Sequence, residues 1–186
     1  MLVTKKKRDI RPRLWPLILS AGVMIVDQVT KIIVIRTIPL GRGVSVIGEF
    51  FRIIHVQNPA LGFSIGRGLE ASTRRPLFAF LPLIVVAIVS LYYFLTRDEI
   101  TRFQRWCFGG LIGGGLGNYI DRIFRPEGVV DFLDFKFYGI FGMERWPTFN
   151  VADMSLVISG ILLFISFLLP TPKKAEASKG PAGGGA

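Results

Sequence analysis

The residues best placed for chemistry are aspartates that lie beside apolar stretches of the sequence. Asp131 lies within the stretch EGVVDFLDF, and Asp153 lies near the start of VADMSLVISGILLF. Asp27 and Asp121 likewise interrupt or border apolar runs. A carboxylate in such surroundings is costly to ionise, so it is expected to be paired with a cation, to be protonated, or to be retained for a function. These four aspartates are therefore the first candidates for a functional site.

Two of these carboxylates would form a catalytic pair if the fold brought them together. Two carboxylates a few ångströms apart do not both ionise easily, so one of them keeps a proton. The ionised partner takes a proton from water, while the protonated partner donates one to a carbonyl oxygen. For Asp131, an aspartate on a neighbouring helix end would complete such a pair. This chemistry cleaves an amide with neither a metal nor a covalent intermediate, and we expect no cofactor.

The rest of the residue inventory argues against several other chemistries. The sequence has one cysteine, Cys107, and one histidine, His55. A single histidine excludes a multi-histidine metal site, and a single cysteine cannot form an intramolecular disulfide. We interpret Cys107 as a small buried apolar residue and His55 as a surface residue of a strand. No metal site is predicted, and carboxylates and amides remain the candidates.

Four apolar segments must position these residues. They cover residues 14–35, 77–95, 103–120 and 151–170, and a helix of about 20 residues crosses a bilayer. The composition agrees, with 51% hydrophobic residues and a mean hydropathy of +0.49. The alternative of a soluble protein needs four core helices with almost no polar face. The alternative of a signal peptide for the first segment fits poorly, because the apolar run is too long and no cleavage site follows it.

We therefore predict a mainly α membrane protein with four transmembrane helices. Residues 1–13 form a basic N-terminus, and residues 14–170 form the membrane domain, with outer connections at 36–76 and 122–148. The stretch VSVIGEFFRIIHVQN predicts a small extracytoplasmic β-rich platform between helices one and two. The polar, glycine-rich tail at 171–186 is predicted to be disordered.

Basic residues are denser on one side of the predicted membrane. The N-terminus, the 97–105 connection and the tail hold 12 lysines and arginines in 38 residues, whereas the other two connections hold 10 in 68. The positive-inside rule then places both termini in the cytoplasm. This topology accounts for the net charge of +10. No nucleic-acid partner is expected, because the basic residues form no single stripe.

With this topology, polar side chains of three helices converge at the outer membrane boundary. Ionisable residues inside a membrane are functional candidates by default. The group lies in the outer half of helix one, at the end of helix three and at the start of helix four: Asp27, Lys31, Asn118, Asp121, Arg122, Asn150 and Asp153.

A purely structural interpretation of this group stays open. Asp27 and Lys31 are four residues apart and share a helix face, so they could form an ion pair. Asp121 could pair in the same way with Arg122. Asn150 could cap helix four, where an acidic residue in the first turn is favourable.

Five short motifs resemble those of one known family. They are DQVTK at 27–31, NPALGFS at 58–64, GGGLGNYIDR at 113–122, VVDF at 129–132 and FNVAD at 149–153. In their order and in the length of the chain they are similar to bacterial lipoprotein signal peptidases, also called signal peptidase II. One departure is visible. The family usually reads Asn-x-Gly-Ala-Ala-Phe where this chain reads Asn-Pro-Ala-Leu-Gly-Phe.

The resemblance implies an aspartic peptidase of the bacterial inner membrane whose catalytic pair is Asp131 and Asp153. The substrate would be a prolipoprotein whose signal peptide precedes a diacylglyceryl-cysteine, cleaved on the amino side of that cysteine at the extracytoplasmic face. Contact with membrane lipid, inhibition by globomycin-type peptides and a monomeric state are also implied. Substrate-binding or pair-supporting roles fall to Asn58, Asn118, Arg122 and Asn150, and structural or supporting roles to Asp27, Lys31 and Asp121.

Two other classes of membrane protein fit less well. A proton-coupled transporter also uses intramembrane carboxylates, but it usually has more spans, an internal repeat or acids at the midplane. A membrane scaffold without catalytic activity needs no cluster of acidic residues. Cleavage of a lipidated precursor would discriminate the peptidase from both.

Overall fold

The chain is described by a computed structural model, which covers residues 11–59, 70–96 and 100–169. The predictions for the first ten residues and for the tail fall outside the described residues. The regular elements, in chain order, are α1 (Arg11–Thr37), β1 (Gly43–Ile47), β2 (Phe51–Asn58), α2 (Ala71–Leu95), α3 (Arg102–Phe124), β3 (Val129–Phe135), the short 3₁₀ helix η1 (Ile140–Gly142) and α4 (Val151–Leu168).

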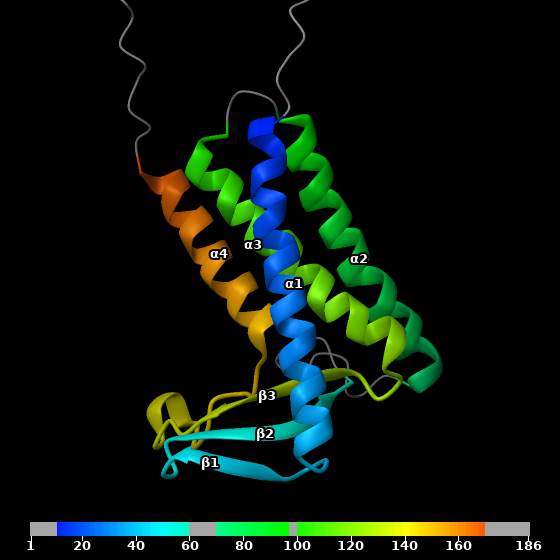
Figure 1. Cartoon of the computed structure of the whole chain (residues 1–186), viewed down its shortest axis with the longest axis vertical. Helices are drawn as coiled ribbons and strands as arrows, with labels where there is room; N and C mark the ends of the chain where they lie inside the picture. The colour runs from blue at the N-terminus through cyan, green and yellow to red at the C-terminus, as the bar shows by residue number, and fades with distance from the viewer. Residues whose placement is uncertain (1–10, 60–69, 97–99, 170–186) are drawn as a thin grey trace, which may run out of the picture.

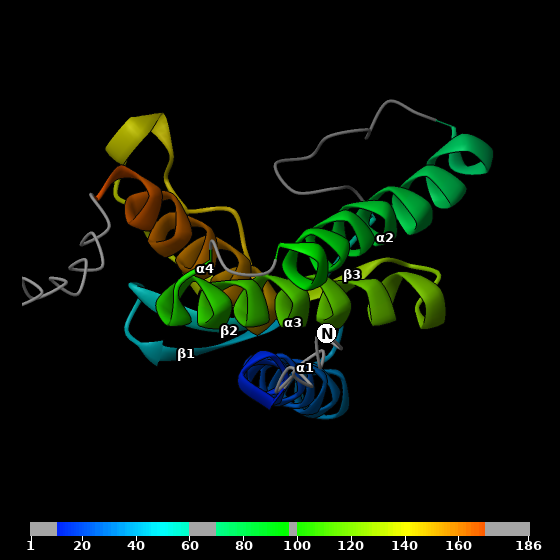
Figure 2. The same ribbon diagram turned by 90° about the horizontal axis from the view of Figure 1, so that it is seen from above.

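The four α-helices run alongside one another, and the sheet lies across one end of the bundle (Figure 1). Seen along the bundle, α3 lies in the middle, with α1 on one side and α2 and α4 on the other (Figure 2). Within the described ranges, two stretches are both long and apolar enough to cross a membrane, Leu14–Thr37 and Val151–Leu168. A shorter apolar stretch, Phe80–Leu95, lies in α2.

The central position of α3 depends on its glycines. A Cβ added at Gly113 would lie 2.7 Å from the carbonyl oxygen of Ser20 on α1. A Cβ added at Gly114 would lie 2.5 Å from the carbonyl oxygen of Ala152 on α4. Both distances are shorter than real contacts of this kind, so α1 and α4 approach α3 closely only because these positions lack side chains.

The sheet has three antiparallel strands in the order β1-β2-β3. Its third strand lies in the connection between helices three and four, whereas the platform was predicted only between helices one and two. β3 pairs with β2 in a register that places Val56 opposite Asp131. Val34 of α1 packs with Val130 and Phe132 of β3 in a small core that joins the bundle to the sheet.

Several predicted boundaries and one burial state change. α1 begins at Arg11, α2 begins at Ala71, and α3 extends to Phe124, so both predicted outer connections are shorter than expected. The prediction that His55 lies on the surface is wrong. Its side chain is buried, and its Nδ1 lies 2.8 Å from the carbonyl oxygen of Ile38, because β2 packs against the end of α1. The prediction that Cys107 is buried is confirmed.

Candidate active site

Asp131 lies in the buried strand β3 and receives two amide hydrogen bonds. Asn58, the last residue of β2, donates from Nδ2 to Oδ2 of Asp131 at 3.1 Å. Asn150 donates from its Nδ2 to Oδ1 of Asp131 at 2.7 Å. Asp131 is 3% exposed, and its strand neighbours Val130 and Phe132 are buried as well. Two strands and a helix cap therefore hold this carboxylate in place.

Asp153 lies in the first turn of α4, where Asn150 is the N-cap. The two residues form a reciprocal capping box: Asn150 Oδ1 accepts from the backbone N–H of Asp153 at 2.9 Å, and Asp153 Oδ2 accepts from the backbone N–H of Asn150 at 3.2 Å. Asn118 on α3 donates from Nδ2 to Asp153 Oδ1 at 2.7 Å. The interpretation of Asn150 as the cap of this helix is confirmed. Its amide has a second use, because the other end faces Asp131.

The two asparagines connect the two aspartates. Asn150 Nδ2 also lies 3.1 Å from Asn118 Oδ1, so hydrogen bonds run from Asp131 through Asn150 and Asn118 to Asp153. The electrostatic effect follows from this proximity. Burial, and after it the charge of Asp153, raises the pKa of Asp131 to about 7, against the hydrogen bonds from Asn58 and Asn150, which lower it. Asp131 therefore holds a proton more tightly than an ordinary aspartate does.

A buried ionic cluster lies behind the amides. The ammonium of Lys31 is fully buried and lies 2.8 Å from Asp27, 2.9 Å from Asp121 and 3.0 Å from the amide oxygen of Asn118. An ammonium has three hydrogens and no lone pair, so these three acceptors saturate it. The predicted ion pair between Asp27 and Lys31 is confirmed. The pairs recorded for Asp121 are with Lys31 and Arg125, rather than with its neighbour Arg122 as predicted.

The same cluster connects the helices to the active strand. Asp27 Oδ1 accepts from the backbone N–H of Ala152 at 2.9 Å, which fixes the start of α4 against α1. Asp121 Oδ2 accepts from the backbone N–H of Val130 at 3.0 Å, next to Asp131 in β3. The ionic cluster therefore positions both segments that carry the candidate pair.

Two members of the cluster were missed in the sequence. Gln28 Nε2 donates to Asp121 Oδ1 at 2.9 Å and to the carbonyl oxygen of Gly117 at 3.0 Å. Arg125 pairs with Asp121, and its Nη1 donates to Gln28 Oε1 at 3.2 Å. The spacing of four between Asp121 and Arg125 is a usable signal for a helical ion pair. Gln28 carries no comparable signal, because its role depends on the packing of α1 against α3.

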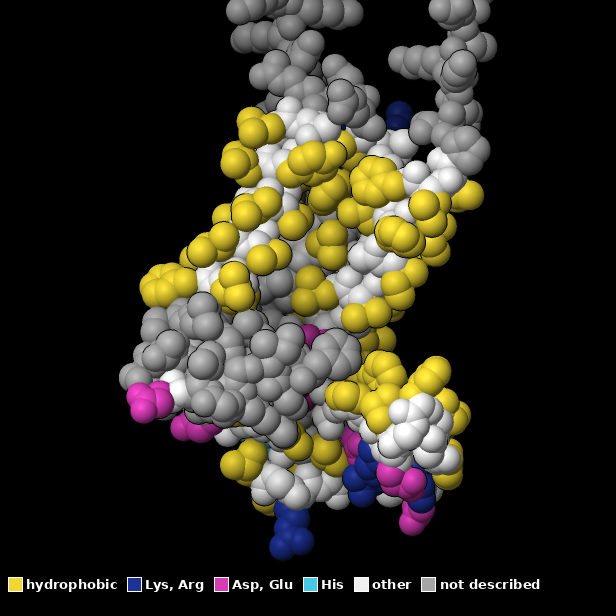
Figure 3. Space-filling view, turned by 180° about the vertical axis from the view of Figure 1, so that it is seen from behind, with side chains coloured by type: hydrophobic (Ala, Val, Ile, Leu, Met, Phe, Trp, Pro, Cys, Tyr) yellow, Lys and Arg dark blue, Asp and Glu magenta, His cyan; other side chains and the backbone are white. Residues whose placement is uncertain are grey.

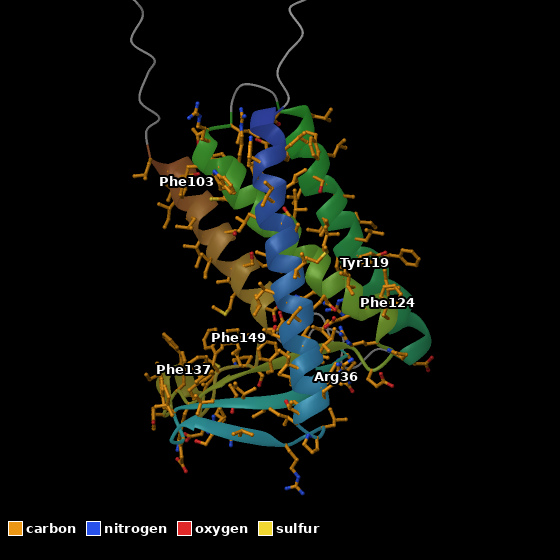
Figure 4. The ribbon with its side chains drawn as sticks, viewed as in Figure 1. Arg36, Phe103, Tyr119, Phe124, Phe137 and Phe149 are labelled. Atoms are coloured by element: carbon orange, nitrogen blue, oxygen red, sulfur yellow. The ribbon has the colours of Figure 1, made fainter. Side chains whose placement is uncertain are left out.

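Arg122 follows Asp121 near the end of α3 and is half-buried. It lies within electrostatic range of both Asp131 and Asp153. The structure thus brings all nine predicted residues to the junction between the bundle and the sheet. Figure 4 shows this junction between Phe149, which precedes the cap of α4, and Tyr119, which follows Asn118 on α3.

Figure 3 shows apolar side chains along α2 and α4 on either side of a hollow, with acidic side chains visible at its lower end. Exposed apolar residues of these two helices include Ile84 and Ile88 on α2 and Val157 and Ile161 on α4.

Comparison with known proteins identifies the family of the chain. Residues 19–169 match the family described as signal peptidase (SPase) II. A lipoprotein signal peptidase of Treponema denticola is 48% identical over 162 residues, which cover 87% of this chain and 92% of that protein. One of Treponema pallidum is 45% identical over 165 residues, which cover 88% of each chain. A solved structure of a bacterial membrane enzyme has a TM-score of 0.71 at 31% identity, covering 87% of this chain and 92% of that chain.

The chain therefore belongs to the signal peptidase II family, a family of aspartic peptidases. It is a membrane enzyme built of helices and a small antiparallel sheet. The activity of the family is the removal of signal peptides from prolipoproteins.

Proposed function

We propose that Asp131 and Asp153 are the catalytic pair of this peptidase and that they activate one water molecule between them. The observation that carries the proposal is their connection through Asn118 and Asn150, together with the rise in the pKa of Asp131 to about 7. Asp153 is assigned the ionised state. It lies at a helix N-terminus, which favours negative charge, and it accepts hydrogen bonds from Asn118 and from the backbone of Asn150.

The proposed reaction moves two protons. Ionised Asp153 takes a proton from water as the oxygen attacks the scissile carbonyl carbon, and protonated Asp131 donates its proton to the carbonyl oxygen. Collapse of the tetrahedral intermediate breaks the C–N bond. Asp153 then passes its proton to the leaving amine, and the hydroxyl of the intermediate returns a proton to Asp131. The pair ends in its starting state, with no cofactor consumed and no metal ligated.

The supporting residues have separate roles in this proposal. Asn58, Asn118 and Asn150 hold the carboxylates at a fixed angle through bonds of 2.7–3.1 Å. Arg122 binds the substrate beside the pair. The buried cluster of Asp27, Lys31 and Asp121 has a structural role, because Lys31 donates a hydrogen bond to the amide of Asn118 and holds it in position.

The proposed substrate is a prolipoprotein with a diacylglyceryl-cysteine, cut on the amino side of that cysteine. Its apolar signal helix would lie in the hollow between α2 and α4 (Figure 3), and its acyl chains would remain in the bilayer. Only the scissile bond would then need to reach water. Globomycin-type peptides would inhibit by occupying the same place, and a monomer is sufficient because one chain supplies both carboxylates.

The proposed topology has four spans in the bacterial inner membrane, both termini in the cytoplasm and the sheet on the outer surface. The density of basic residues supports it, as does the position of the sheet at one end of the bundle (Figure 1). Reporter fusions at Lys174 and within residues 64–76 should report opposite sides of the membrane. Reports from the same side would overturn the topology.

The proposed substrate is tested with purified protein in detergent. A precursor carrying the diacylglyceryl group and the same precursor without it are incubated in parallel, and the products are identified by mass spectrometry. The expected result is a new amino terminus at the lipidated cysteine in the first sample alone. Equal cleavage of both precursors, or cleavage at another bond, would contradict the proposed specificity.

A further inference from the structure

The connection between β3 and α4 forms a short hairpin with an exposed apolar tip. Residues 136 and 145 form an antiparallel bridge at its base. At the tip, Tyr138 is 62% exposed, Ile140 55% and Phe141 83%. Phe141 is the most exposed large hydrophobic residue described in the chain. Nothing in the catalytic proposal uses these three side chains.

Much of the backbone of this tip is hydrogen-bonded internally. The backbone N–H groups of Phe137, Gly139, Ile140, Gly142 and Met143 donate to carbonyl oxygens within the hairpin, at 2.8–3.1 Å. A loop usually needs water for these groups, and its burial in lipid is then costly. The five internal bonds lower the cost of moving this tip out of water.

Tyr138 and Phe141 both have positive φ angles, 52° and 55°, alternating with positive-φ glycines at 139 and 142. Bulky side chains rarely adopt this backbone conformation, which persists only where the surroundings enforce it. The result is a tight turn that directs aromatic and aliphatic side chains outward instead of folding them into the core.

Charged residues lie at the base of the hairpin and not at its tip. Lys136 pairs with Glu49 at 2.5 Å and with Glu144 at 3.5 Å, and Arg145 pairs with Asp134 at 2.7 Å. In Figure 3, apolar side chains gather on the part of the sheet region nearest α4, and acidic and basic side chains lie farther from the helices. An apolar tip above a charged base matches the polarity gradient of a bilayer surface, where aromatic residues are enriched.

We propose that this hairpin inserts Tyr138, Ile140 and Phe141 into the outer surface of the bilayer and so sets the depth of the catalytic pair. The link to the pair is short. The hairpin begins directly after β3, which carries Asp131, and its far arm returns to the cap of α4. The proposal relies on the proposed placement of the sheet at the outer membrane surface.

The hairpin is joined rigidly to both arms of the site. Trp146 N–H donates to the carbonyl oxygen of Phe135 at 3.0 Å, and Phe149 and Leu133 form a backbone bridge. The Phe135 ring stacks on Phe51 at 4.6 Å and on Phe149 at 5.8 Å between centroids. A shift of the tip is therefore transmitted to the strand of Asp131 and to the start of α4.

Depth is measured directly with spin labels on the full chain in lipid nanodiscs. In a Cys107→Ala background, a nitroxide is attached at Phe141→Cys and, as the matched control, at Glu144→Cys. Glu144 is 69% exposed and lies on the charged side of the same hairpin. The label at 141 should be relaxed mainly by oxygen and the label at 144 mainly by a water-soluble nickel chelate. Equal access of the nickel chelate to both labels would overturn the proposal, and a label at 141 shielded from both the chelate and oxygen would indicate a protein contact instead of lipid.

A second measurement connects depth to activity. The double variant Ile140→Ser/Phe141→Ser should lower kcat/KM for a lipidated precursor about tenfold in nanodiscs, since small misplacements of reacting groups are costly, and should change it less than twofold in detergent. Equal losses in the two media would indicate a folding defect and contradict the anchor. The spin-label result does not depend on turnover, so failure of the catalytic proposal would leave it interpretable.

Discussion

The ammonium of Lys31 lies 3.0 Å from the amide oxygen of Asn118 and thereby fixes which end of that amide faces Asp153. An ammonium only donates hydrogen bonds, so it must face the oxygen of the amide. The nitrogen of Asn118 is then directed at Asp153, at 2.7 Å. Lys31 therefore orients the amide of Asn118 toward Asp153, although Lys31 itself makes no hydrogen bond to Asp131 or Asp153.

Removal of this amide should slow turnover without unfolding the protein. We expect Asn118→Ala to lower kcat by about 10²-fold and to leave residual cleavage, because the amide orients a carboxylate but moves no proton. The measurement is kcat for a lipidated precursor, together with the Tm in detergent. Unchanged kcat would reduce Asn118 to an ordinary helix residue.

Asn150 should show two effects, because its amide has two uses. Asn150→Ala should lower kcat and also lower stability by about 1 kcal/mol through loss of the α4 cap. The matched control is Thr101→Ala, which removes the capping box of α3 far from the carboxylates. The control should lose similar stability and keep its activity. Equal kcat for both variants would show that Asn150 is a cap alone.

Loss of Lys31 should mainly affect stability. Lys31→Met leaves Asp27 and Asp121 buried without their shared cation. A buried charge that loses its partner costs about 3–5 kcal/mol. Lys136→Met is the comparison, because this lysine pairs with exposed Glu49 and should matter little. Thermal unfolding in detergent measures both, and similar Tm values for the two variants would contradict the assigned role of the cluster.

The raised pKa of Asp131 predicts two dependences on pH. In the proposed mechanism Asp131 reacts in its protonated form, so kcat should fall as pH rises through about 7. The free energy of unfolding should also fall as pH rises. The folded state binds the proton of Asp131 more tightly than the unfolded state does, where the pKa is near 3.8. The stability contribution of this group is therefore complete below pH 3.8 and is lost by about pH 7.

Asp131→Asn removes this penalty and should therefore have a higher Tm than the parent at pH 8. The difference between the two proteins should shrink toward acid pH. The comparison of Tm values across pH separates this effect from the titration of other carboxylates, which both proteins share. A variant less stable than the parent at pH 8 would contradict the direction of the pKa shift.

The sequence predicted the helices well because their signal is local. The predicted apolar runs coincide closely with α1, α2, α3 and α4, and the boundaries differ by a few residues. It did not predict β3, because VVDFLDF is apolar on both sides and has no alternation that marks a strand with one solvated face. That strand is buried by contacts with β2 and α1, which lie far away in the chain.

The sequence predicted that the candidate residues lie together, but it missed Gln28 and Arg125 and did not predict the hydrogen bonds that connect the group. The convergence of the polar residues followed from their depth along the helices, and the motif resemblance selected Asp131 and Asp153 among the aspartates. The double use of Asn150 could not be predicted, because its second partner lies 19 residues away on a strand that was missed. The misassigned surface position of His55 has the same cause, since α1 covers the face of β2 on which it lies.

The central claim is that Asp131 and Asp153 act as one catalytic unit, and it is tested by cleavage of a lipidated precursor with purified variants in detergent. Asp131→Asn and Asp153→Asn should each lower kcat by about 10³-fold or more, and the double variant should be scarcely worse than either, because residues that act together are non-additive. Glu127→Gln, an exposed acid near β3, is the control and should keep full activity. Substantial cleavage by either single variant, with correct folding and insertion, would contradict the account.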